Sequence, residues 1–479
     1  MSQFDVATAA VQAAIDAGAR YADARVMHRR YESMSARNGE IEELSQTESA
    51  GIGVRALVGS SWGFYAVPDL TDQSARAAGT QATAIATASA AVPGPASALI
   101  PAGAPAVDSW ASPCEVDPLG VPLSDKGDLL VRATEIMREH GADQAEGLYQ
   151  IWDTGKWFVS SEGHRIDQRI RECGAGIAAI AVGDGETQRR SYPSYRGQYG
   201  TRGWELVTEL DLLGHAAEIA DQARALLTAP QCPAGETTLI LGGEQLALQI
   251  HESVGHAIEL DRILGWEAAL AGTSWLDLAK LGELRYGSEL MNITIDPTIP
   301  GALGSFGYDD EGTPAARRYA VRDGIWVGVL AGRDSAAVAG LDYGGAVRAE
   351  GWSRLPMVRM TNVGLEPGPH TLEEIIAATD DGILMDINRS WSIDDRRLNF
   401  QFGCEIGWEI KNGKRGRMLR NPTYTGIGPR FWNSMDMLSS EIVAWGTPNC
   451  GKGQPMQIGH TGHPAAPARF TNVRVGVRA

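Results

Sequence analysis

The stretch LNFQFGCEIGWEIKNGKRG, at residues 398–416, decides the fold class of this chain. It is a strand-like run interrupted by Asn412 and Gly413, and Asn-Gly between two such runs predicts a tight β-hairpin. The stretch RRYAVRDGIWVGVLAG, at residues 317–332, carries an Asp-Gly pair in the same setting. Hairpins join antiparallel neighbours, whereas a doubly wound sheet needs helical crossovers between parallel strands. Because helical patterns also occur along the chain, these turns predict an α+β fold.

Residues 231–479 are expected to form a large domain rich in antiparallel strands. Further strand-like runs occupy residues 237–242, 290–296 and 357–365. Helices are expected at about residues 244–267 and 370–379. The second of these begins with Thr371 as its N-cap, and Glu374 completes a capping box.

The first half of the chain shows the same order of elements twice. A helix at about residues 4–17 is followed by strands with an Asn-Gly turn at 38–39, and a helix at about 124–140 is again followed by strands. Two pairs of glycines are each separated by 124 residues, namely Gly39 with Gly163 and Gly59 with Gly183. We therefore expect a repeated helix-plus-β-meander unit, which a helix at about residues 204–228 closes.

A stretch rich in alanine and proline, at about residues 86–113, is expected to be a linker or a loop on the surface, because its composition cannot build a core. The sequence thus predicts an N-terminal α+β domain at residues 1–106, a central α+β domain at 114–230 and the C-terminal domain at 231–479.

Composition and charge narrow the class of protein. The 479 residues are 43% hydrophobic and 21% charged, as in a globular protein of more than one domain. A net charge of −17 argues against nucleic acid or an anionic membrane as the main partner. No apolar run is long enough to span a membrane, and the N-terminus lacks the basic leader of a signal peptide. Five scattered cysteines fit a reducing compartment, so we expect a cytoplasmic protein.

The hexapeptide HESVGH, at residues 251–256, places two histidines in a helical context. A regular α-helix turns by about 100° per residue, so His251 and His256 would lie about 140° apart, too far to bind one ion. One extra residue in the turn, a π-bulge, would reduce this offset to about 40°, as in an i, i+4 pair. Gly255 would ease such a bulge. The spacing therefore permits a metal site if the helix is locally distorted; the alternative is a hydrogen-bonded pair of core histidines.

A zinc site needs a third protein ligand and an open position. The candidates are the nearby carboxylates Glu259 and Asp261 and the distant side chains Cys450, His460 and His463. Cys450 lies in GTPNCGKGQP, which is expected to be a turn where Lys452 favours the thiolate. The alternatives are a small buried cysteine and, for GHTGH at residues 459–463, a solvated loop. Glu252 stands beside the first histidine, where a hydrolytic metal site requires a base.

Four separate segments resemble the TldD/PmbA family, and in particular its TldD branch. HESVGHAIELD, at residues 251–261, looks like the HExxxH segment of that branch. Residues 21–64 are similar to the N-terminal domain of the family. YDDEGTPAARRYAVRDG, at residues 308–324, and CGKGQP, at residues 450–455, resemble its C-terminal domain. The matches occur in the family's order and extend over nearly the whole chain.

The resemblance implies a cytoplasmic metallopeptidase with one Zn²⁺. It carries over His251, His256 and Cys450 as the metal ligands and Glu252 as the catalytic base. It also implies a partner subunit of the PmbA/TldE type, which lacks the HExxxH motif, in a heterodimer that encloses the active site; a homodimer is the alternative.

The chain departs from the family pattern near its end. The tail MQIGHTGHPAAPARF contains His460 and His463, and Pro448 and Asn449 look inserted before the cysteine. Additional or alternative metal ligation by the two histidines therefore stays open.

We expect zinc to activate a water molecule while Glu252 takes its proton, so that unfolded or short peptides are cleaved. The acidic residues Asp309, Asp310 and Glu311 are expected to form a solvated turn or to shape the site, and they are left out of the catalytic set. Two other functions remain open, namely a non-catalytic modulator or binding subunit and a metal-dependent hydrolase of another amide.

Overall fold

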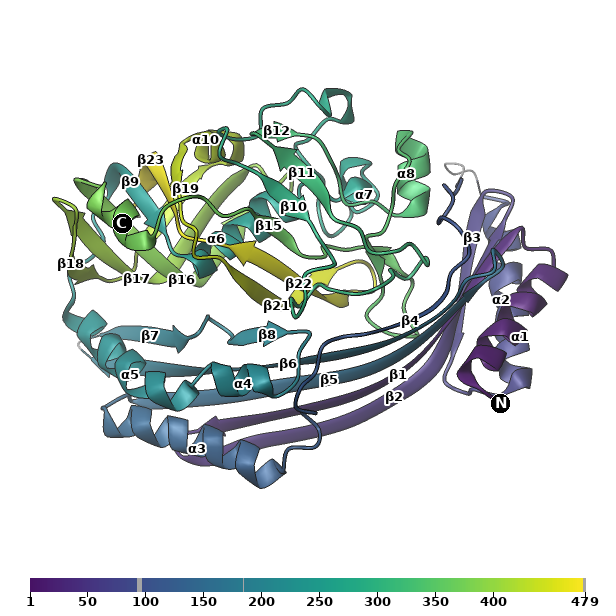
Figure 1. Ribbon diagram of the computed structural model, residues 1–479, viewed down its shortest axis with the longest axis horizontal. Helices are drawn as coiled ribbons and strands as arrows, with labels where there is room; N and C mark the ends of the chain where they lie inside the picture. The colour runs from purple at the N-terminus through teal and green to yellow at the C-terminus, as the bar shows by residue number, and fades with distance from the viewer. Residues whose placement is uncertain (93–96, 184, 477–479) are drawn as a thin grey trace.

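The computed structural model describes residues 1–92, 97–183 and 185–476, and a long curved sheet forms one side of the molecule (Figure 1). The strand order of this sheet is β3-β2-β1-β5-β6-β4, and β7 and β8 also pair with β6. Its strands are β1 (Tyr21–Arg37), β2 (Glu40–Val58), β3 (Ser61–Val67), β4 (Val107–Ala111), β5 (Gln144–Ser160), β6 (Arg165–Gly183), β7 (Glu186–Tyr192) and β8 (Gln198–Gly200). The 17 residues of β1 span roughly 55 Å at about 3.3 Å per residue, so this sheet extends along the whole C-terminal region.

The expected recurrence of a helix-plus-meander unit is confirmed. In the first unit α1 (Gln3–Asp16) precedes β1 to β3 and α2 (Asp72–Ser89) follows them; in the second α3 (Leu123–Glu139) precedes β5 to β8, and α4 (Glu205–Glu209) and α5 (Leu212–Thr228) follow. The two units meet where β1 pairs antiparallel with β5. Figure 1 shows the helices of the two units at opposite ends of the sheet, on its outer side. The division at residues 106 and 114 stays a prediction, because both segments contribute strands to one sheet.

The C-terminal region contains a seven-stranded sheet with the order β16-β9-β23-β19-β17-β18, to which β20 is added, and a four-stranded sheet with the order β12-β11-β10-β15. The strands of the larger sheet are β9 (Gly235–Leu241), β16 (Asp381–Ile393), β17 (Asn399–Lys411), β18 (Lys414–Leu419), β19 (Thr423–Ile427), β20 (Met435–Leu438) and β23 (Ala468–Val475). Those of the smaller sheet are β10 (Ile293–Ile295), β11 (Arg318–Arg322), β12 (Ile325–Trp326) and β15 (Val363–Leu365). Two strand pairs complete the region, β13 (Val347–Arg348) with β14 (Met357–Val358) and β21 (Val443–Lys452) with β22 (Gln457–Ala465).

The predicted hairpins and the α+β class are confirmed. Asn412 and Gly413, between β17 and β18, both have positive φ angles, 52° and 71°, as a two-residue hairpin turn of this type requires. Among the named strands of the described residues, every pairing is antiparallel except β4 with β6 and β9 with β16. The helices of this region are α6 (Gly243–Ile250), α7 (Leu260–Ile263), α8 (Arg333–Ala339), α9 (Leu372–Ala377) and α10 (Gly428–Asn433). The capping box predicted for Thr371 and Glu374 is present at the start of α9.

The hairpin β21–β22 lies between the large curved sheet and the rest of the C-terminal region (Figure 1). Gln198 of β8 donates a hydrogen bond to the carbonyl of Ala444 on β21, at 2.8 Å. His460 of β22 packs edge-on against Trp152 of β5, with ring centroids 4.6 Å apart. The segment that holds Cys450 is therefore fixed against the concave face of the curved sheet.

The acidic residues at positions 309–311 are buried, so the expectation of a solvated turn is wrong. Asp309, Asp310 and Glu311 are each only 1% exposed. The curved sheet supplies their counter-charges, since Lys156 lies 2.5 Å from Asp310 and Arg55 lies 3.1 Å from Glu311. These ion pairs join the C-terminal region to the curved sheet.

Two expected helices differ in the structure. The helix expected at residues 244–267 is α-helical only to Ile250, where a π-helical turn begins at His251; the chain then leaves helical structure, and Glu259 forms a β-bridge with Leu330. The helix expected at 204–228 is broken at Asp211, whose φ is 46° and whose side chain caps α5.

The stretch expected to be a linker, at about residues 86–113, is partly regular structure. It includes the end of α2 and the strand β4, while residues 93–96 lie outside the described residues. The helices α2, α8 and α10 were not expected; α2 buries mainly alanines, which give a weak periodic signal.

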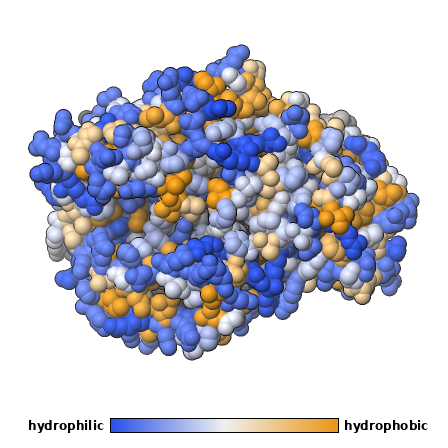
Figure 2. All heavy atoms as spheres, in the orientation of Figure 1, coloured by the Kyte–Doolittle hydropathy of each residue, from blue (hydrophilic) through white to orange (hydrophobic). Residues whose placement is uncertain are grey.

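The surface agrees with the acidic, polar composition. Figure 2 shows a face that is largely hydrophilic, with hydrophobic residues in small separate groups. Among the described residues, no helix combines the length and the apolar character that a membrane span requires.

Candidate metal centre

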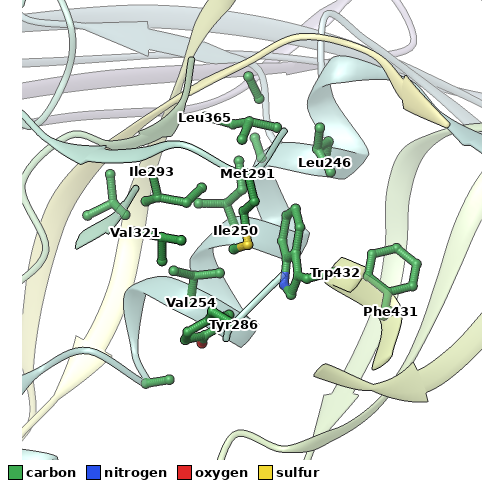
Figure 3. Packing of buried hydrophobic residues seen from close by; sticks show 14 of the residues in the cluster. Leu246, Ile250, Val254, Tyr286, Met291, Ile293, Val321, Leu365, Phe431 and Trp432 are labelled. Carbon is green, nitrogen blue, oxygen red and sulfur yellow. The ribbon is translucent and has the colours of Figure 1, made fainter. Parts of the chain in front are cut away.

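The motif helix is fixed in the core by one apolar face. α6 follows directly on β9, which lies inside the seven-stranded sheet. Leu246, Ile250 and Val254 are fully buried. Figure 3 shows these side chains packed among Tyr286 and Met291, which come from later in the chain. Burying each such side chain stabilises the fold by about 1.5–3 kcal/mol, so the position of the helix is well determined.

The predicted π-bulge is present in the motif. Residues His251–Gly255 form a π-helical turn, in which the backbone N–H of His256 donates to the carbonyl of His251 at 3.0 Å. The hydroxyl of Tyr286 donates to the Ser253 carbonyl at 2.5 Å, so this carbonyl of the widened turn has a partner inside the core. A Cβ atom at Gly255 would lie 2.1 Å from the sulfur of Met360, which explains why glycine occupies this position.

The structure brings His251, His256 and Cys450 together. One ligand atom of each lies within 4.8 Å of the others, and all three residues are buried. The two imidazole centroids are 4.7 Å apart with ring planes at 82°, and Cys450 Sγ lies 3.8 Å from His256 Nε2. The ligand atoms of a tetrahedral zinc ion are separated by roughly 3.3–3.7 Å. The three residues therefore fit one zinc ion after small movements of their side chains.

Cys450 lies in strand β21 rather than in the expected turn. Thr447 pairs with Thr461 and Cys450 with Gly459, so β21 carries one extra residue between these pairs. This bulge contains Pro448 and Asn449, the residues that looked inserted in the sequence. The bulge turns the strand locally and directs the thiol of Cys450 towards the motif helix.

The electrostatic surroundings favour the thiolate, but not through Lys452 as expected. Burial raises the pKa of the Cys450 thiol, yet Arg359 and His256 outweigh burial and hold the pKa below its ordinary value. Lys452 instead forms a buried ion pair with Asp261, at 2.7 Å. Asp261 is therefore engaged in this pair and not in the ligand group.

His463 supports His251 instead of lying in a solvated loop. It is fully buried on β22, and its Nε2 lies 2.8 Å from His251 Nδ1. His463 Nδ1 lies 2.9 Å from the carbonyl of Val363, which can only accept a hydrogen bond. Neutral His463 thus donates from Nδ1 and accepts at Nε2, so His251 donates from Nδ1. This leaves the lone pair on His251 Nε2 for a metal ion.

Glu259 supports His256 in the same way. Glu259 Oε2 lies 3.0 Å from His256 Nδ1, and the carboxylate is fully buried. Burial raises the pKa of Glu259, but Lys452 and Arg262 outweigh it and hold the pKa well below its ordinary value. The ionised carboxylate accepts a hydrogen bond from Nδ1–H of His256, which leaves Nε2 of this imidazole free for a metal ion. Glu259 is therefore placed as a support for a ligand and not as a ligand.

Glu252 lies on the wall of the same cavity as the three candidate ligand residues. This cavity, of about 460 Å³, is lined by His251, Glu252, His256 and Cys450 among others. Arg397, from the loop between β16 and β17, lies 3.0 Å from Glu252 Oε2. The ion pair fixes the orientation of the carboxylate at the cavity.

His460 lies away from the ligand group. Its Nδ1 is 3.0 Å from Glu172 of the curved sheet.

Burial lowers the pKa values of His251, His256 and His463 below their ordinary values, so these imidazoles favour the neutral, metal-binding form.

The sequence prediction missed three contributors to the site. The supporting role of Glu259 had a signal, since it lies three residues after His256, where helical neighbours meet. The role of His463 and the ion pair of Arg397 had no local signal, because both residues are far from the motif in sequence.

Comparison with known protein families covers most of the chain. Residues 22–86 match a model described as PmbA/TldA metallopeptidase domain 1, residues 116–227 match the central domain and residues 234–476 match the C-terminal domain.

Individual proteins resemble this chain over nearly their whole length or over about half of it. A metalloprotease of Methanocaldococcus jannaschii is 28% identical over 92% of this chain and 94% of its own. A zinc metalloprotease TldD homolog of Saccharolobus solfataricus is 27% identical over 48% of this chain and 49% of its own. The crystal structure of TldE from Thermococcus kodakarensis is 17% identical, with a TM-score of 0.73 over 98% of this chain and 99% of that one. The last likeness concerns the fold alone.

Proposed function

The chain belongs to the PmbA/TldA metallopeptidase family and is a peptidase, and on that premise we propose that it cleaves unfolded or short peptides with one zinc ion held by His251, His256 and Cys450. The observation that carries this proposal is the convergence of the three ligand atoms within 4.8 Å, with Glu252 on the wall of the same cavity. A structural zinc site has four protein ligands and needs no base, whereas a catalytic site keeps three ligands and an open position.

The donor set favours zinc over other divalent metals. Two neutral imidazoles and a thiolate are borderline-soft ligands that suit zinc, while magnesium, calcium and manganese prefer oxygen. When bound, zinc supplies a Lewis acid that activates water and polarises the peptide carbonyl.

Side chains of the protein carry out the proton transfer and hold the other groups in position. Glu252 accepts the proton of the attacking water at its carboxylate and delivers it to the leaving nitrogen of the peptide. Arg397 orients that carboxylate. His463 and Glu259 hold the two imidazoles in the tautomer that keeps each Nε2 unprotonated. The substrate is proposed to bind in an extended form along a sheet edge. Backbone hydrogen bonds at such an edge bind a peptide with little dependence on its side chains.

We also propose that the chain works in the cytoplasm with a partner subunit of the PmbA/TldE type or with a second copy of itself. The free state of all five cysteines, each in the described part of the chain, supports a reducing compartment. The similarity in fold to TldE supports a pairing of related chains.

The test combines metal analysis with peptide cleavage. Purified wild-type protein is expected to contain about one zinc per chain and to cleave an unfolded polypeptide or a short peptide, alone or with a partner subunit. Chelation should abolish cleavage and added zinc should restore it. Cys450→Ala should lose both zinc and activity, while the matched control Cys114→Ala, at a cysteine outside the ligand group, should keep both. Cleavage that survives removal of the metal would overturn the proposal.

A further inference from the structure

A second cavity, of about 390 Å³, lies between the curved sheet and the C-terminal region. β1, β5 and β6 form one side of it, and β13, the segment after β14, and β22 form the other. Four of its lining residues are basic, namely Arg29, Lys156, Arg348 and Arg359, and three are acidic, namely Glu172, Asp310 and Glu350. None of these side chains takes part in the proposed proton transfer, although Arg359 also acts on the Cys450 thiol.

The positive charge of this cavity is not balanced. Lys156 is paired with Asp310 at 2.5 Å, and Glu172 lies 3.0 Å from His460. Glu350 has no ion pair among the described residues and accepts a hydrogen bond from the backbone N–H of Ile458 at 3.0 Å. The lining thus has four basic side chains against three carboxylates.

Three of the lining arginines, Arg29, Arg348 and Arg359, form no ion pair of their own in the described part of the chain. Arg29 donates from Nε to the hydroxyl of Thr154 at 3.0 Å. Arg348 donates to the carbonyl of Met360, and Arg359 donates to the carbonyls of Cys450 and Gln457.

Two of these guanidinium groups still have an unused donor. The Nε atoms of Arg348 and Arg359 are buried and have no hydrogen-bond partner among the described residues. Arg359 is only 2% exposed. A buried donor without a partner destabilises the protein, so a ligand that accepts its hydrogen bond is favoured on binding.

The cavity adjoins the candidate metal centre. Pro448 lines both cavities. Gly459, which lines the second cavity, pairs with Cys450 across the hairpin. A Cβ atom at Gly459 would lie 2.4 Å from Nη2 of Arg359, so the guanidinium group lies directly against this glycine. Adjacent strands are about 4.8 Å apart and an extended peptide advances about 3.3 Å per residue. A peptide bond at the candidate metal centre would therefore lie about one or two residues from Arg359.

We propose that this second cavity is a subsite for a carboxylate of the peptide substrate, bound by Arg29, Arg348 and Arg359. Guanidinium groups bind carboxylates through paired N–H donors. Three guanidinium groups that line a cavity with an excess of positive charge therefore favour a negatively charged ligand. The carboxylate is either the free C-terminus of a short peptide or the side chain of an aspartate or glutamate next to the cleaved bond. The inference rests on the proposed function, since it places the carboxylate relative to a peptide bond at the metal centre.

Equilibrium binding to metal-free protein tests the subsite without cleavage. The probes are three peptides: acetyl-tetraalanine with a free C-terminus, the same peptide as its C-terminal amide, and acetyl-Ala-Ala-Glu-Ala amide. Wild type is expected to bind at least one of the two peptides that carry a carboxylate about tenfold more tightly than the neutral amide, as a charge-assisted hydrogen bond allows. Tighter binding of the free acid identifies a terminal carboxylate, and tighter binding of the glutamate peptide identifies a side chain.

Two variants attribute the preference to the arginines. Arg29→Gln and Arg348→Gln should each reduce the preference about tenfold while leaving affinity for the neutral amide unchanged. The matched control Arg30→Gln, at the next residue of β1 and outside the lining of the cavity, should keep the preference. Equal affinity of wild type for all three peptides, or a preference that both variants retain, would overturn the inference. A failure of the proposed function would give a different result. Zinc-loaded protein would then not hydrolyse peptides, while the metal-free protein would still prefer the peptides that carry a carboxylate.

Discussion

His251 Nδ1 lies 2.8 Å from His463 Nε2, although the two residues are 212 positions apart in the sequence. Since His463 in turn donates to the Val363 carbonyl, the pair fixes which nitrogen of His251 is free. A histidine near the end of the chain thus holds a candidate metal ligand of the motif helix in the tautomer that binds metal, and His463 is not itself one of the three candidate ligands.

Replacing His463 should weaken zinc binding without removing a ligand. His463→Leu fills the same buried space but cannot accept the hydrogen bond from His251 Nδ1–H, so zinc affinity should fall about 10–100-fold. A competition titration with a chelator of known affinity measures the effect. His460→Gln is the control, because His460 bonds Glu172 and lies outside the ligand group. Unchanged zinc affinity in His463→Leu would show that the His251 tautomer does not depend on this contact.

Glu252→Gln should separate metal binding from proton transfer. The amide keeps the shape of the side chain but cannot act as a base, so kcat for peptide cleavage should fall about 10²–10⁴-fold at full zinc content. Kinetics and elemental analysis on the same sample measure both quantities. Glu236→Gln, at an exposed position on β9, is the control and should leave both unchanged. A variant that retains zinc and wild-type kcat would exclude Glu252 as the base.

Gly255→Ala should disturb the π-helical turn. Its Cβ atom would lie 2.1 Å from Met360 Sδ in a closely packed core, and such overpacking costs about 1–3 kcal/mol of stability. Because the same turn positions His256, zinc affinity should fall as well. Denaturant unfolding and zinc titration measure the two effects.

Two further variants test this explanation of Gly255. In Gly255→Ala/Met360→Ala the obstructing sulfur is absent, so zinc affinity should recover in part. Gly235→Ala is the control, since nothing lies within 4 Å of its added Cβ atom. A Gly255→Ala protein with wild-type stability and zinc affinity would contradict the role of this glycine.

The local geometry of the site could be predicted because it follows from spacing alone. Two histidines five residues apart can approach one ion only through a widened turn, and the structure has this turn at His251–Gly255. The hairpin turn at Asn412 and Gly413 was equally predictable, because few residue pairs adopt positive φ without strain.

The supporting contacts could not be predicted, because they depend on tertiary structure. Asp310 looked like part of a solvated turn, but Lys156 on the curved sheet pairs with it and buries it. Lys452 looked like the partner of the Cys450 thiolate, but it forms an ion pair with Asp261. The glycines around His463 suggested a loop, yet Gly462 is in strand β22. In each case the deciding partner is distant in sequence and has no local pattern.

Glu244 should make stability fall as pH rises. Burial raises the pKa of this carboxyl from 4.5 to about 8, despite a hydrogen bond from the Asn388 backbone N–H, and the charge of Asp386 adds to the rise. Between these two pKa values the folded state holds a proton that the unfolded state has released. The free energy of unfolding therefore decreases with rising pH, by at most about 1.4 kcal/mol per pH unit from this group. The contribution is complete below pH 4.5 and is lost above about pH 8.

Glu244→Gln removes this titration while its side-chain oxygen can still accept the Asn388 hydrogen bond. Relative to wild type, the variant should gain stability steadily between pH 5 and pH 8, and the difference should be smallest at pH 5. Urea unfolding of both proteins at pH 5, 6.5 and 8 measures the change, with Glu236→Gln as the exposed control. A difference between variant and wild type that is constant over this range would mean that Glu244 is already ionised in the folded protein at pH 5.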